Sequence, residues 1–377
     1  MTKKLWIFLI LAILLAGIFF IISPLSGSNI SYEKVEQVPQ IEKPKIPISV
    51  IIPPLDKVAY DLKLLELANN PPPKIVTKTV VTKDKNGKVT KKKVPLDPQP
   101  TPPTPLWPIK TVYPNDGALL PFNRIVAYYG NLFSTKMGVL GEYPPGEMIS
   151  RLEGEVKKWQ DADPNTPVIP ALHYIAVVAQ GSAGKDGKYR ARMPDVEIEK
   201  VLKIAEKINA IVFLDFQVAF SSLERELPLY EKYFKLPNVH LGIDPEFSMK
   251  NGIRPGKVVG TFDASDVNYA ANFLAKIVKE NKLTPKILVV HRYTEKMLTN
   301  YKNITPLPEV QIVVHMDGWG DKPHKLSTYE YYVRKQPVQF TGFKLFYKND
   351  IWGKGTVLFT PEELIKLNPR PIYIQYQ

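Results

Sequence analysis

Apolar and polar residues alternate in a regular way from Arg124 to the end of the chain. Short runs of β-branched and aromatic residues are followed by longer runs in which apolar residues recur every three or four positions. The short runs are typical of buried strands and the longer ones of amphipathic helices, so the alternation indicates repeated βαβ units. The predicted strands are 124–130, 168–178, 210–218, 239–247, 286–294, 310–317, 340–347 and 371–376. The predicted helices are 146–161, 196–208, 223–234, 264–282, 295–300, 327–335 and 361–368.

Eight strands within residues 124–377 predict an α/β fold, a closed (β/α)8 barrel of the TIM type. The main rival is an open, doubly wound sheet. Such sheets often carry a Gly-rich phosphate loop after the first strand. Here the first strand is followed by Gly130-Asn131-Leu132-Phe133, which is not such a loop.

The N-terminus has a different pattern, because 5–22 is an uninterrupted apolar run that follows Lys3 and Lys4. About 20 apolar residues span a bilayer core, and cytoplasmic flanks favour lysine. We therefore predict a transmembrane signal anchor at 5–25, with residues 1–4 in the cytoplasm and the rest of the chain extracytoplasmic. The alternative is a cleaved signal peptide, which would leave the protein secreted.

Residues 26–123 predict a Pro-rich, Lys-rich extracytoplasmic stalk, because half of the 36 prolines precede residue 124. Segments 46–55 and 95–108 are typical of extended polyproline spacers. Residues 55–70 have helical spacing. Residues 74–94 predict a β-hairpin, because Asn86-Gly87 between two Thr/Val/Lys runs suits a tight turn.

The net charge of +13 is densest in the stalk, where residues 74–93 contain eight Lys and one Asp. Such a cluster attracts polyanions. We expect a cell-envelope polysaccharide or other anionic wall polymer as the partner, with anionic lipid as another candidate and no nucleic acid. The alternative is a self-repelling linker that simply stays solvated. The chain has no cysteine, which excludes disulfides, Cys-ligated metals and a Cys nucleophile.

Carboxylates lie at the ends of three predicted strands. Asp215 lies near the end of the third strand, Asp244 and Glu246 lie near the end of the fourth, and Asp317 ends the sixth. The ends of barrel strands form one rim, where active sites are built. Crowded carboxyls raise the pKa of one member, and a protonated acid beside an ionised one is what glycoside cleavage requires. We predict Glu246 as the general acid and Asp244 as its partner, with Asp215 and Asp317 as further catalytic carboxylates.

Other polar and aromatic residues near the strand ends are candidates for substrate binding. Aromatic planes pack against sugar rings, and the polar groups can bind hydroxyls. No cofactor and no metal ligand is predicted. The candidates are Tyr128, Gln217, His291, His315, Trp319, Lys344, Tyr347 and Gln375.

The segment 242–246 (GIDPE) resembles the fourth-strand Asp-x-Glu of chitinase-type and lysozyme-type barrel glycosidases. The resemblance implies that Glu246 is the proton donor and that Asp244 orients or stabilises. The longer chitinase pattern has further Asp residues upstream, where this chain has Val239, His240 and Leu241. As a whole, residues 124–377 resemble an uncharacterised family of secreted or anchored bacterial TIM-barrel proteins, through VAYYG, IDPEF, VVHRYT and HMDGWG. That resemblance implies fold and location but no reaction.

Two other functions compete with the glycoside hydrolase. His291 and His315 at the ends of the fifth and sixth strands resemble the amidohydrolase arrangement of metal-dependent hydrolases. That family also has His-x-His on its first strand and Asp on its eighth. Here those strands read Val126-Ala127-Tyr128 and Tyr373-Ile374-Gln375. The third possibility is a barrel that binds glycan, or serves as a scaffold, without catalysis.

Overall fold

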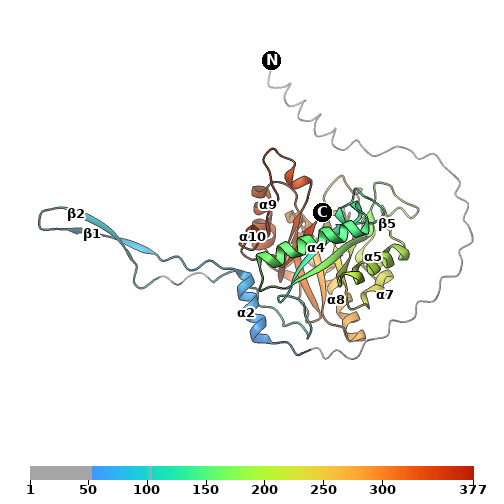
Figure 1. Cartoon of the computed structure of the whole chain (residues 1–377), viewed down its shortest axis with the longest axis horizontal. Helices are drawn as coiled ribbons and strands as arrows, with labels where there is room; N and C mark the ends of the chain where they lie inside the picture. The colour runs from blue at the N-terminus through green and yellow to red at the C-terminus, as the bar shows by residue number, and fades with distance from the viewer. Residues whose placement is uncertain (1–52, 100, 102–103) are drawn as a thin grey trace, which may run out of the picture. The chain divides into compact units, whose positions relative to one another are not determined.

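The computed structural model describes residues 53–99, 101 and 104–377 and contains a closed barrel of eight parallel strands (Figure 1). Closure is shown by the first barrel strand, which pairs in parallel with both the second and the last. This architecture is consistent with the TIM type. All eight predicted strands are confirmed. They are β3 (Arg124–Gly130), β4 (Val168–Ala179), β6 (Ile211–Phe216), β7 (Val239–Ile243), β9 (Lys286–Arg292), β11 (Val310–Met316), β12 (Phe340–Leu345) and β13 (Tyr373–Tyr376).

The strands are buried on both faces, as parallel strands covered by helices must be. One set of alternating side chains, including Val126, Leu241 and Val314, packs against the helices. The other set fills the barrel interior, with Ala127 and Phe213 among its members. A short strand, β5 (Arg190–Arg192), extends the sheet by pairing antiparallel to β4.

Three long predicted helices are observed close to their predicted bounds. α4 (Pro145–Ala162) and α5 (Asp195–Lys207) cover neighbouring strands, and α8 (Ala264–Asn281) packs on β9. The helix predicted at 327–335 begins earlier, as α9 (Lys322–Tyr329), because the Asp321 side chain caps it. It continues as the π-helical turn η5 (Glu330–Arg334), and the last helix is α10 (Pro361–Leu364).

Two of the predicted helices do not form as single α-helices. Residues 223–234 form α6 (Leu223–Glu226), the 3-10 turn η1 (Leu227–Tyr230) and α7 (Glu231–Phe234), because Pro228 supplies no N–H in the middle of the run. The prediction of a helix at 295–300 is wrong. Residues 295–297 form a 3-10 turn, and β10 (Leu298–Thr299) pairs with β8 (Phe262–Asp263).

The segments on either side of the predicted hairpin pack on the barrel rather than standing apart as a stalk. Tyr60 of α2 (Lys57–Ala68) and Leu120 belong to the same apolar cluster as the interior residue Phe213. The Gln311 side chain binds both the N–H and the C=O of Leu120, and the Trp107 indole donates to the Arg334 carbonyl. These segments were assigned to the stalk because of their prolines, but their apolar residues belong to the core of the barrel domain.

The hairpin is confirmed as an antiparallel pair, β1 (Thr77–Lys83) and β2 (Val89–Pro95). Gly87 has a φ of +80°, the left-handed value that this turn position requires. The apolar run 5–22 and the anchor assigned to 5–25 lie outside the described residues. Within the described part of the chain, no helix is long and apolar enough to cross a membrane.

Candidate active site

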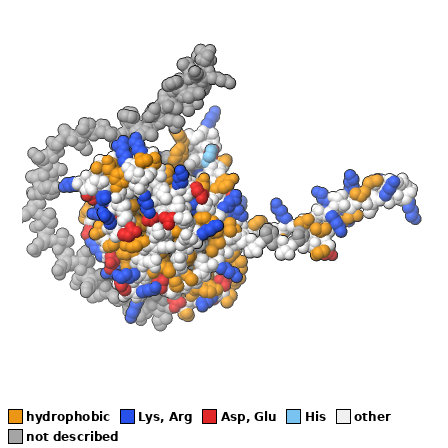
Figure 2. All heavy atoms as spheres, turned by 180° about the vertical axis from the view of Figure 1, so that it is seen from behind, with side chains coloured by type: hydrophobic (Ala, Val, Ile, Leu, Met, Phe, Trp, Pro, Cys, Tyr) orange, Lys and Arg blue, Asp and Glu red, His pale blue; other side chains and the backbone are white. Residues whose placement is uncertain are grey.

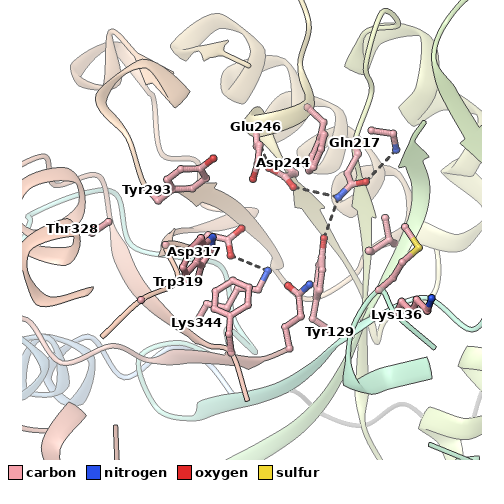
Figure 3. Close-up of a pocket in the computed structure, with 18 of the residues that line it drawn as sticks. Tyr129, Lys136, Gln217, Asp244, Glu246, Tyr293, Asp317, Trp319, Thr328 and Lys344 are labelled. Carbon is pink, nitrogen blue, oxygen red and sulfur yellow. Dashed lines mark hydrogen bonds and ion pairs between the residues drawn. The ribbon is translucent and has the colours of Figure 1, made fainter. Parts of the chain in front are cut away.

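A cavity of about 700 Å³ opens at the end of the barrel where the strands finish, as predicted for the site (Figure 3). Residues that follow seven of the eight strands contribute to its wall. Its polar lining includes two acids from the β7 exit, one from the β11 exit, and a lysine from β12. These are Asp244, Glu246, Asp317 and Lys344, joined by Tyr129, Gln217, Tyr293, Trp319 and Phe346.

The chain turns sharply where it leaves β7, and this turn positions both acids of the Asp-x-Glu motif. β7 ends at Ile243 rather than at the predicted residue 247, because Pro245 has no N–H for a strand ladder. Residues 245–247 form the 3-10 turn η2, which Asp244 caps by accepting from the Glu246 N–H at 3.0 Å. Asp244 is therefore held rigidly, while Glu246 extends along the cavity wall (Figure 3).

The pKa values of Asp244 and Glu246 are both raised above those of free carboxyls. Burial raises the pKa of Asp244 well above its ordinary value, although His291 opposes the rise. Burial, reinforced by the charge of Asp317, also raises the pKa of Glu246, while Lys344 and a hydrogen bond from Tyr293 oppose it. A carboxyl that is protonated and faces a cavity can donate a proton to a bound ligand.

Asp317 has the opposite character. Burial disfavours its charge, but Lys344 and His291 outweigh burial and lower the pKa of Asp317 below its ordinary value. The Lys344 Nζ lies 2.8 Å from one carboxylate oxygen, and His291 Nδ1 lies 2.8 Å from the other. The Lys344 ammonium also lies over the Tyr129 ring, 3.9 Å from its centre. The cavity thus contains an ionised carboxylate with fixed cationic partners.

A second polar layer lies directly beneath the cavity and is completely buried. Asp215 Oδ1 is 3.2 Å from His173 Nε2 and 3.4 Å from His291 Nε2. His173 Nδ1 is 2.6 Å from the Tyr373 hydroxyl. Burial opposes the charge of His291, but Asp215 and Asp317 on its two sides raise its pKa to about 10. Burial lowers the pKa of His173 to about 4, so this imidazole is neutral.

The structure separates the predicted site residues into three groups. Glu246, Asp244, Asp317, Gln217, Trp319 and Lys344 line the cavity, as predicted. Asp215, His291, His315 and Gln375 are buried in the barrel interior and do not line it. Tyr128 and Tyr347 lie on the helix side, where their hydroxyls are 3.1 Å apart.

The placement of Tyr128 is a correction, because its neighbour Tyr129 lines the cavity instead. Side chains alternate along β3, so Ile125, Ala127 and Tyr129 face inward while Tyr128 faces the helices. The Tyr129 hydroxyl donates to Asp215 at 3.1 Å and accepts from Gln217 at 3.3 Å. Ala127 is a small residue and suits the crowded barrel interior. Its position in the sequence could have indicated that Tyr129, two residues later, faces inward and that Tyr128 does not.

Tyr347 and Gln375 are placed differently from the prediction for separate reasons. Tyr347 packs against Tyr376 and lines a small adjoining cavity of about 120 Å³. Gln375 points into the barrel at a level below the cavity, where it donates to Tyr373. Tyr293 and Phe346 also line the cavity. The predicted strands 286–294 and 340–347 included them, whereas the observed strands end just before them, at Arg292 and Leu345.

The loop that carries Trp319 is fastened by a buried ion pair. Lys325 Nζ is 2.9 Å from Asp350 and donates to the Gly318 carbonyl at 2.8 Å. Asp350 in turn accepts from the backbone N–H groups of Gly320 and Phe346. Trp319 itself is 58% exposed, so its ring presents a free aromatic plane at the cavity.

Two groups of buried side chains could hold a metal ion within the described residues. One comprises His173, Asp215 and His291, and the other His291, His315 and Asp317. Nitrogen and carboxylate ligands of this kind suit zinc. The second nitrogen of His291 binds Asp317, as the outer partner of a metal-bound histidine would.

No family model matches the chain, and no curated protein matches its sequence. The candidate function therefore depends on the site itself.

Proposed function

We propose that the barrel is a glycoside hydrolase-like enzyme that acts on a cell-envelope polysaccharide. The observation that carries the proposal is the opposed electrostatics of Glu246 and Asp317, which line the same cavity. Burial and the neighbouring charge of Asp317 raise the pKa of the Glu246 carboxyl, which favours its protonated form. The Asp317 carboxyl is kept ionised by Lys344 and His291. Glycosidic bond cleavage requires such a pair.

Each group then has a role that follows from its position. Glu246 protonates the oxygen of the leaving sugar, and Asp317 stabilises the positive charge that develops on the sugar ring or activates the attacking group. Asp244 is a positioning residue, because it binds the Glu246 N–H and the Gln217 amide. Trp319, which is exposed at the cavity, offers an aromatic plane to the C–H face of a sugar.

The role first assigned to Asp215 changes. Its carboxylate is fully buried beneath the cavity and is occupied by His173, His291 and Tyr129. It therefore supports the site by fixing the charge on His291, which in turn holds Asp317. Asp215 acts through other residues and does not contact the substrate.

The test is a panel of envelope glycans assayed for binding and for new reducing ends. Glu246→Gln removes the acidic proton and keeps the shape, and Glu153→Gln, at an exposed position of α4, is the matched control. The proposal expects turnover by the wild type and the control, with binding but no turnover by Glu246→Gln. Binding without turnover by the wild type would instead favour a non-catalytic glycan-binding barrel.

A second candidate is a metal-dependent hydrolase, and the buried His/Asp groups favour it. Metal analysis of the purified protein tests this alternative independently of any substrate. A stoichiometric transition metal that is lost in His173→Ala and His291→Ala would support it. Metal-free protein that cleaves glycan would remove it.

The location of the barrel is also a proposal. We infer from the apolar run 5–22 and its flanking lysines that the protein is single-pass, with its N-terminus inside and its barrel outside the membrane. Protease treatment of intact cells or spheroplasts tests this. Digestion of the barrel supports the arrangement, protection contradicts it, and barrel found in the medium indicates signal cleavage.

A further inference from the structure

The hairpin formed by β1 and β2 is a ribbon of lysines that faces solvent on both sides. Residues 74–93 contain eight Lys and a single acid, and every one of these lysines is exposed. Blue side chains line the ribbon in Figure 2. The single acid, Asp84, uses one carboxylate oxygen to accept from the N–H groups of Asn86 and Lys88, so it is committed to the turn.

The strand register spaces these charges regularly. Lys91 and Lys93 lie on one face, opposite Val81 and Thr79 of the partner strand. Lys92 lies on the other face, opposite Val80. Alternate residues of a strand are about 6.8 Å apart, so Lys91 and Lys93 present two cations at a spacing comparable to that of an extended phosphodiester chain. The other face carries Lys92 on β2 and Lys78 on β1.

The distribution of side chains selects among possible polyanions. A membrane surface can contact only one face of a ribbon, and binders of membrane surfaces place cations on one side and apolar or aromatic anchors on the other. Here lysines and valines occur on both faces, and residues 74–94 contain no aromatic residue. Binding of single-stranded nucleic acid relies on aromatic stacking of the bases, which this ribbon cannot supply.

We propose that the hairpin docks onto a linear phosphodiester polymer, which can follow the ribbon and contact lysines on both faces. An isolated two-stranded hairpin is only marginally stable in water, so a bound polymer would also hold its strands together by neutralising their repulsion. This site is separate from the cavity and does not depend on the barrel being an enzyme. It would retain the protein at a phosphate-rich layer whatever reaction the barrel performs.

The experiment measures binding of fluorescent poly(glycerol phosphate) to the full chain in detergent, across a range of salt concentrations. The test variant is Lys91→Gln/Lys92→Gln/Lys93→Gln. The matched control, Lys203→Gln/Lys207→Gln/Lys302→Gln, makes the same change in net charge at exposed positions elsewhere. We plot the logarithm of the affinity against the logarithm of the salt concentration. Counterion release predicts that the negative slope of this plot is shallower by about 2 for the hairpin variant than for the wild type.

The proposal expects at least about tenfold weaker binding at low salt for the hairpin variant and little change for the control. Equal weakening by both variants would show attraction to the net charge alone and would overturn it. Absence of wild-type binding would overturn it as well. A third arm uses vesicles of phosphatidylglycerol and phosphatidylcholine, and a hairpin variant that loses vesicle binding while keeping polymer binding would reassign the surface to lipid.

Discussion

Gly242 offers a stringent test of the buried layer beneath the cavity. It lies on β7, in register with Asp215 on β6, and points into the barrel. A Cβ added there would lie 2.4 Å from Asp215 Oδ1 and 2.4 Å from His173 Nε2, whereas ordinary contacts are 3.4–4 Å. Neither neighbour is the free end of a flexible chain, because both side chains are fully buried and their facing atoms lie 3.2 Å apart.

Gly242→Ala is therefore expected to displace these two groups. Overpacking costs about 1–3 kcal/mol. Weakened polar contacts to the buried Asp215 carboxylate add about 1.5–3 kcal/mol, so we expect a loss of about 2.5–6 kcal/mol in the free energy of unfolding. The matched control is Gly154→Ala, at an exposed position inside α4 where an added Cβ meets nothing within 4 Å. That change should stabilise by about 0.5–1 kcal/mol.

The assay is urea unfolding of the full chain in mild detergent, followed by circular dichroism. Opposite signs for the two Gly→Ala changes are expected. A Gly242→Ala protein as stable as the wild type would refute the packing of His173 and Asp215 around this position. It would also contradict the inference that this buried layer holds His291 and Asp317 in place.

Three further predictions concern the cavity and its surroundings. Turnover should fall as pH rises through the raised pKa of Glu246, because only the protonated form donates, and a kcat/KM profile without that alkaline fall contradicts the assignment. Tyr129→Phe should lower kcat at least about tenfold while Tyr128→Phe leaves it nearly unchanged, and equal effects would contradict the observed parity. Lys325→Met leaves the buried Asp350 carboxylate without its cation and should cost about 3–5 kcal/mol in urea unfolding. Lys157→Met, at an exposed pair, should cost under about 0.5 kcal/mol, and similar costs would argue against a fastened loop.

The strands were predictable because parallel strands buried on both faces leave continuous β-branched runs, such as residues 286–292. The long helices were predictable from their periodicity. Residues 295–300 were not, because the Thr299 and Asn300 side chains bind the Asp263 carboxylate, a long-range contact that local spacing does not encode. The packing of 104–123 was missed because proline content resembled that of a linker.

The site could be predicted in part. Carboxylates at strand ends correctly indicated the cavity walls formed by Asp244, Glu246 and Asp317. The depth of each group along its strand could not be read from spacing, so Asp215 was placed at the rim although it lies beneath it. The choice between Tyr128 and Tyr129 depends on which alternate residues of β3 face the barrel interior. An error of one residue exchanges the inward and outward faces of the strand.

The central claim is that the cavity raises the pKa of Glu246 while Lys344 and His291 lower the pKa of Asp317. Carbon-13 NMR titration of the side-chain carboxyls, with Glu246→Gln and Asp317→Asn used to assign the resonances, tests it most directly. We predict that the Glu246 resonance titrates above the ordinary Glu value of about 4.3. The Asp317 resonance should titrate below the ordinary Asp value of about 3.9. A Glu246 carboxyl that titrates at or below its ordinary value would contradict the account.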